Sequence, residues 1–77
     1  MLNEDKLKKV MAIMLKVDLS EINEDSSMDN VVSWDSLRHM NLVIALEEEF
    51  RVTIPDEDAA NITSYKLIKL VLNDLGV

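Results

Sequence analysis

The 77 residues have room for one small domain, residues 1–77. The absence of cysteine excludes disulfides, and with only one histidine a structural metal is not expected. Hydrophobic residues make up 48%, and glycine and proline occur once each, which argues against disorder and against an all-β domain. The net charge of −7 has the wrong sign for nucleic-acid binding, so we expect partner proteins with basic patches. No apolar stretch reaches the length of a membrane span, and we expect a cytoplasmic protein. We also expect it to be monomeric.

The first predicted helix follows Asn3, which can cap it. Glu4 and Asp5 lie in its first turn, where carboxylates interact favourably with the helix dipole. The helix should end near Lys16 or Val17. Its apolar residues recur at helical spacing: Leu7, Val10, Met11 and Met14.

A long loop is predicted from Asp18 to Asp35, where hydrophobicity has no sustained period and serine and asparagine are frequent. Residues 20–22 can form a short helical turn within it. Loops of this length in compact domains are usually functional. Several apolar residues are expected to hold the loop against the core: Leu19, Ile22, Met28, Val31 and Val32.

The rest of the chain is predicted to form three further helices. The segment Ser36–Arg51 has the strongest helical pattern. Pro55 can open a short helix as its first residue, ending at residues 61–63. Ser64 then caps a last helix, 65–75. The predicted fold is therefore all-α: a small four-helix bundle of three main helices and one short one, with a long first loop.

The helix over residues 36–51 has two apolar stripes at about 100° per residue. One side carries Leu42, Val43, Leu46 and Phe50, with His39 beside them. Nearly opposite lie Leu37, Met40 and Ile44, flanked by Asn41, Glu47 and Glu48. An outer helix of a bundle buries one broad stripe, so the second stripe predicts a docking surface for a partner with an apolar groove and a basic rim. The alternative is a central helix buried on both sides.

Charged residues near this stripe suggest further contacts. Glu47 can pair with Arg51 at i,i+4. Arg38 interrupts the acidic surface, so it should discriminate against enzymes that suit acidic carriers, unless it merely pairs with Asp35.

The sequence Trp34-Asp35-Ser36-Leu37 stands where the long loop meets this helix. Together with the segments EEEF at 47–50 and IPDED at 54–58, it resembles the acyl carrier protein family over nearly the whole chain. Asp-Ser-Leu alone is a weak signal, whereas the combination at these separations is specific.

The resemblance implies a four-helix carrier, not an enzyme, in which Ser36 receives 4′-phosphopantetheine from coenzyme A and the arm holds acyl or aminoacyl groups as thioesters. It also implies three kinds of partner: a phosphopantetheinyl transferase, an acyl- or aminoacyl-loading enzyme, and acyltransferase or synthase enzymes. The residues agree with this interpretation. A serine at a loop-to-helix junction is exposed, and an attached phosphate would face unpaired N–H groups of the first turn. Asp35 can cap the helix in its place.

The chain departs from many fatty-acid carriers on both sides of the motif. Val32-Ser33-Trp34 precedes it where those carriers have a glycine nearby, and Arg38, His39 and Asn41 follow where they have acidic residues. The variant looks more like carriers of specialised pathways. Trp34 is either a recognition residue beside the arm or, as we favour, an anchor of the loop.

Two other functions remain open at this point. An unmodified helical interaction module would use the same apolar stripe without needing the Ser36 hydroxyl. A hydrolase would use Ser36 with His39, three residues later, but it lacks an orienting third group and a glycine-rich oxyanion loop. We therefore expect His39 to be a boundary residue that packs beside Leu42 and Val43.

Overall fold

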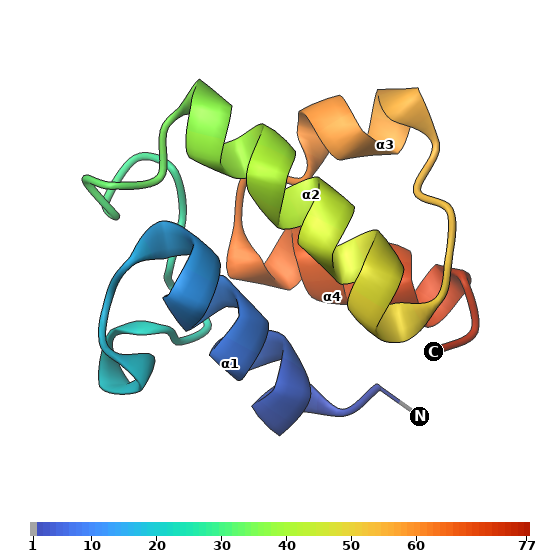
Figure 1. Ribbon diagram of the computed structural model, residues 1–77, viewed down its shortest axis with the longest axis horizontal. Coiled ribbons are helices and arrows are strands. Elements are labelled where there is room, and N and C mark those ends of the chain that lie inside the picture. The colour runs from blue at the N-terminus through green and yellow to red at the C-terminus, as the bar shows by residue number, and fades with distance from the viewer. Residues whose placement is uncertain (1) are drawn as a thin grey trace.

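The computed structural model describes residues 2–77, which form helices around one hydrophobic core (Figure 1). Along the chain come α1 (Glu4–Leu15), a 3₁₀ turn (Leu19–Glu21), α2 (Ser36–Phe50), α3 (Asp56–Asn61) and α4 (Tyr65–Asp74). The predicted all-α bundle of three main helices, one short helix and a long first loop is confirmed. None of the helices in this described range is long and apolar enough to cross a membrane.

Three of the helices begin at a side-chain cap. Asn3, Asp35 and Ser64 each accept the backbone N–H three residues ahead, at 3.1, 2.8 and 3.2 Å. Pro55 differs from the prediction, because its ψ of 145° keeps it extended and makes it the N-cap of α3 rather than its first residue. The acidic residues 56–58 then fill the first turn of α3, at the positive end of its dipole.

α1 and α2 both end at a residue in the left-handed conformation. Lys16 has φ 56° and Arg51 has φ 54°, and their backbone N–H groups return to the carbonyls of Ala12 and Glu47. The prediction that α2 includes Arg51 is therefore wrong by one residue. The left-handed turn at Arg51 directs the chain out of the helix after Phe50.

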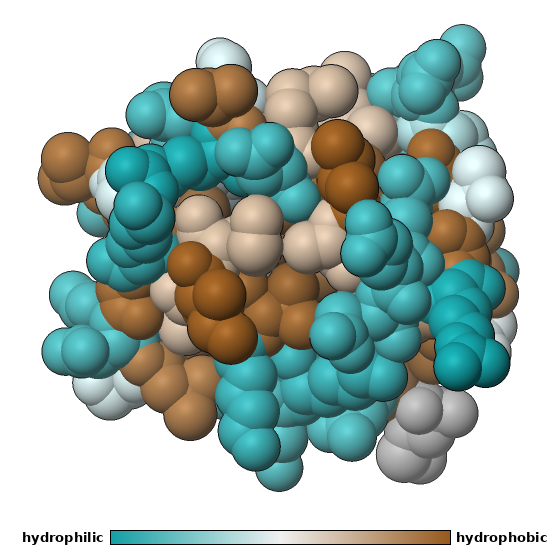
Figure 2. All heavy atoms as spheres, viewed as in Figure 1, coloured by the Kyte–Doolittle hydropathy of each residue, from teal (hydrophilic) through white to brown (hydrophobic). Residues whose placement is uncertain are grey.

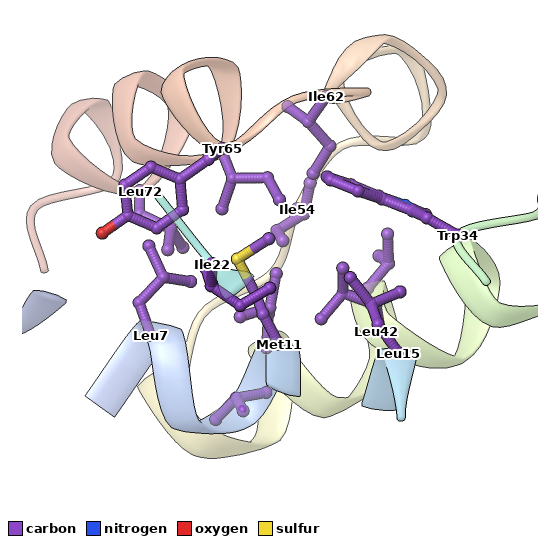
Figure 3. Packing of buried hydrophobic residues seen from close by; sticks show 14 residues of the cluster. Leu7, Met11, Leu15, Ile22, Trp34, Leu42, Ile54, Ile62, Tyr65 and Leu72 are labelled. Atoms are coloured by element: carbon purple, nitrogen blue, oxygen red, sulfur yellow. The ribbon is translucent and has the colours of Figure 1, made fainter. Parts of the chain in front are cut away.

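The core lies between α1, α2 and α4, with contributions from both connecting segments (Figure 3). From α2 it receives the predicted stripe of Leu42, Val43 and Leu46, while Phe50 is only partly buried. The remaining buried apolar residues are Leu7, Val10, Met11, Leu15, Ile22, Trp34, Ile54, Ile62, Tyr65, Ile68 and Leu72.

The apolar anchors of the long loop are only partly as predicted. Ile22 is buried, and Met28 and Val31 are partly buried against the core. Leu19 and Val32 are 46% and 101% exposed, so their predicted contribution is wrong. Hydrogen bonds supplement the remaining apolar contacts of this loop.

The loop is hydrogen-bonded to the start of α4 and to the end of α1. The backbone N–H of Met28 donates to the Thr63 carbonyl at 3.0 Å, and that of Tyr65 to the Ser26 carbonyl at 2.9 Å. The hydroxyl of Ser33 donates to the Leu15 carbonyl at the C-terminus of α1. The segment that leads to α2 is thereby fixed at both of its ends.

Candidate functional site

Ser36 is the first residue of α2 and is exposed. The cap of this helix is Asp35, whose carboxylate accepts the Arg38 N–H at 2.8 Å and whose carbonyl accepts the His39 N–H at 2.8 Å. The prediction that Asp35 can take the capping role is confirmed. The Ser36 hydroxyl is therefore available for chemistry at no cost to the helix cap.

The start of α2 suits a phosphate on this hydroxyl. The first N–H groups of a helix lack intrahelical partners, and those of Ser36 and Leu37 remain after Asp35 has capped Arg38. The first turn of this 15-residue helix contains no acidic residue that would repel an anion. An exposed hydroxyl beside free N–H groups fits a phosphodiester-linked group.

Trp34 is an anchor, as favoured from the sequence. Its side chain is 2% exposed and points from the end of the loop toward Ile54 and Ile62 (Figure 3). The indole Nε1–H donates to Nδ1 of His39 at 3.0 Å, and the two rings stack with centroids 6.1 Å apart. Trp34 therefore fixes the backbone immediately before the Asp35-Ser36 pair.

His39 is 7% exposed and bonded through both ring nitrogens. Because an indole N–H can only donate, Nδ1 must accept from Trp34, so Nε2 carries the hydrogen and donates to the Ala59 carbonyl at 2.7 Å. Neither nitrogen retains a lone pair for Ser36, which removes the base that a serine–histidine hydrolase needs. The expected boundary residue is in fact a buried connection to α3. An isolated histidine on an apolar stripe was the only sequence signal for it.

The second apolar stripe of α2 is exposed. Leu37, Met40 and Ile44 are 72%, 57% and 51% exposed, so the alternative of a helix buried on both sides is wrong. Asn41 and Glu48 are exposed beside them. Figure 2 shows apolar atoms gathered near the centre of the face over α1 and α2, with hydrophilic atoms around them.

Glu47 does not form the expected ion pair with Arg51. It is half-buried, and its carboxylate accepts the Ile54 N–H at 2.9 Å. The ion pairs within residues 2–77 involve Lys6 and Lys69, and none joins Glu47 to Arg51. Part of the Glu47 carboxylate thus holds the turn before α3, and Glu48 is the more available acid beside Ile44.

Arg38 borders a groove of about 490 Å³ between α1 and the start of α2. The groove is lined by Ile13, Met14, Lys16, Asp35, Leu37, Arg38 and Asn41. The alternative that the Arg38 side chain pairs with Asp35 is wrong, because the Asp35 carboxylate accepts the backbone N–H of Arg38 instead. The ion pairs found in residues 2–77 include neither Arg38 nor Lys16. Two cations without an ion-pair partner therefore lie near the start of α2 in a protein of net charge −7.

One comparison with known proteins bears on this site. The sequence profile of the family described as phosphopantetheine attachment site matches residues 5–71. The match extends from the first turn of α1 into α4 and includes the junction between the loop and α2.

Proposed function

Because the chain belongs to the phosphopantetheine attachment family of carrier domains, which bear a covalent 4′-phosphopantetheine, we propose that Ser36 is its attachment residue. Three observations support this assignment. Ser36 is exposed at the start of α2, its hydroxyl is not needed for capping, and it stands within the Asp-Ser-Leu sequence. The arm supplies the thiol that a cysteine-free chain lacks, and acyl or aminoacyl groups are held on it as thioesters.

The residues around Ser36 position the attachment point without catalysing a reaction. Asp35 caps the helix and Trp34 fixes the preceding backbone, and the first N–H groups of α2 would interact with the phosphate of the attached arm. With His39 hydrogen-bonded through both ring nitrogens, its imidazole is not free to act as a general base for Ser36. The chain is therefore a carrier whose chemistry is done by other enzymes.

The exposed stripe of α2 is the surface that those enzymes contact. Leu37, Met40 and Ile44 provide apolar contact next to the attachment residue. Glu48 and the accessible part of Glu47 give this surface an acidic rim, to which Asn41 adds a neutral polar group. The phosphopantetheinyl transferase, the loading enzyme and acyltransferases or synthases with basic patches are its partners.

Intact-mass measurement tests the attachment. Wild-type protein co-expressed with a broad-specificity phosphopantetheinyl transferase should gain one phosphopantetheine mass, and Ser36→Ala should gain none. Ser20→Ala, which removes another exposed serine, should be modified like wild type. An unmodified wild type with several transferases would reject the carrier function and leave an unmodified interaction module.

A further inference from the structure

α3 is a short helix with few attachments of its own. It has six residues, none of them buried, and a helix of this length is not stable in isolation. The carbonyl of Ala59, in its last turn, accepts the Nε2–H of His39 at 2.7 Å. A side chain of α2 thus supplies a hydrogen bond to one of the carbonyls that the end of α3 leaves unpaired.

The same histidine also holds both residues that precede Ser36. Its backbone N–H donates to the Asp35 carbonyl at 2.8 Å, and its Nδ1 accepts the Trp34 indole at 3.0 Å. Since the indole requires Nδ1 to be the acceptor, Trp34 selects the ring form whose Nε2–H reaches Ala59. One chain of hydrogen bonds, buried at the Trp34–His39 link and partly buried at Ala59, therefore runs from the start of α2 to the end of α3.

We propose that His39 is a positioning residue for Ser36, through which the position of α3 determines the placement of the attachment serine. A displacement of α3 removes the acceptor at Ala59, loosens the imidazole and releases Trp34, two residues before Ser36 in the chain. This inference rests on the proposed function for the reaction at Ser36, but the link between α3 and Trp34 exists with or without the arm.

Transferase kinetics on the unmodified protein test the first half of the proposal. Glutamine at position 39 offers both an acceptor and a donor, whereas leucine is of similar size and offers neither. With coenzyme A and one transferase, His39→Leu should lower kcat/KM for modification about tenfold or more, because small misplacements of reacting groups are costly, and His39→Gln should restore most of the rate. Equal rates for His39→Leu and His39→Gln would overturn the positioning role.

A substitution in α3 tests whether the position of α3 affects Trp34 and Ser36. This test does not require a His39 variant to fold. Ala60→Gly, at an exposed position of α3, weakens that helix, and Lys9→Gly is the matched change in α1. Trp34 is the one tryptophan of the chain, so its indole N–H gives a single NMR signal. Ala60→Gly should speed exchange of that hydrogen several-fold and slow modification of Ser36, while Lys9→Gly should change neither.

The outcomes of the two proposals are distinguishable. If the α3 amides exchange faster in Ala60→Gly but the Trp34 indole does not, α3 is not coupled to the attachment region and the inference fails. If wild type is never modified, the carrier function fails, whereas the indole measurement still decides whether α3 and Trp34 are coupled.

Discussion

The Tyr65 hydroxyl donates to the Glu4 carboxylate at 2.9 Å and joins the start of α4 to the start of α1. Lys69 also contacts Glu4, at 3.3 Å, and pairs with Glu24 of the long loop. Burial, followed by the hydrogen bond to Glu4, raises the pKa of Tyr65. The hydrogen bond from Tyr65, followed by that from Lys69, lowers the pKa of Glu4.

These two pKa shifts predict the pH dependence of stability. A raised pKa in the folded state means that the contribution of Tyr65 is complete below its unfolded value, about 10, and is lost as pH rises through the higher folded value. The contribution of Glu4 is present above its unfolded value, about 4.3, and is lost as pH falls through the lower folded value. We expect Tyr65→Phe to melt below wild type at neutral pH, with the difference narrowing toward both extremes. Lys69 is present in both proteins, so the difference between them reports on the Tyr65–Glu4 hydrogen bond. A difference in melting temperature that stays constant from acid to alkaline pH would contradict a stabilising role of this hydrogen bond.

The two sides of α2 should respond differently to truncation. Leu46 is fully buried, so Leu46→Ala should cost roughly 2–5 kcal/mol of unfolding free energy, the usual range for core leucines. Ile44 is 51% exposed, so Ile44→Ala should stay within about 0.5 kcal/mol of wild type while weakening partner use. Urea denaturation and transferase assays measure the two effects. An Ile44→Ala variant as unstable as Leu46→Ala would exclude a docking role for this stripe.

The left-handed end of α2 offers a stabilising substitution. A non-glycine residue in this conformation costs about 1–2 kcal/mol, and Arg51 is exposed without an ion pair in residues 2–77. Arg51→Gly should therefore raise the unfolding free energy by about 0.5–1 kcal/mol and the melting temperature by a few degrees. Lys66→Gly, in the right-handed helix α4, should do the opposite. A lower melting temperature for Arg51→Gly would show that the arginine side chain stabilises the end of α2.

Arg38 should influence which enzymes accept the carrier. Its charge lies between Ser36, the proposed attachment residue, and the acidic end of α2, where it would repel a basic partner surface. Arg38→Glu should improve use by a fatty-acid elongation enzyme several-fold, most clearly at low salt where screening is weak.

Lys66→Glu is the control for net charge, because Lys66 is exposed in α4 and its replacement alters the net charge by the same amount as Arg38→Glu. The same gain in both variants would show that only total charge matters. Equal rates for wild type and Arg38→Glu across a salt series would reject the specificity role.

Side-chain caps, which depend on neighbouring residues, were predictable from the sequence, whereas contacts with residues distant in the chain were not. Asn3 and Ser64 cap the helices they precede because a cap reaches only three residues ahead. The left-handed conformation of Arg51 has no such signal, since glycine is the residue that usually marks it.

The other differences between prediction and structure concern the hydrogen-bond partners of Glu47 and His39. Glu47 had a cation four residues away, but an unpaired backbone N–H at Ile54 lies within reach once the chain turns toward α3. The Ala59 carbonyl that accepts from His39 lies 20 residues away and is brought close only by tertiary packing. The apolar exposure beside Ser36 was predictable because a 3.6-residue period separates the two faces of a helix directly.

The hydrogen bonds that join Ser26 to Tyr65 and Met28 to Thr63 also set an order of events during synthesis. A ribosome releases Ser36 well before Tyr65, so the serine emerges while the loop that leads to it still lacks its partners, Thr63 and Tyr65. A transferase that reads the folded junction rather than a short peptide must wait until Tyr65 has emerged and paired. An attached arm would then mark those chains whose last helix has already closed onto the loop.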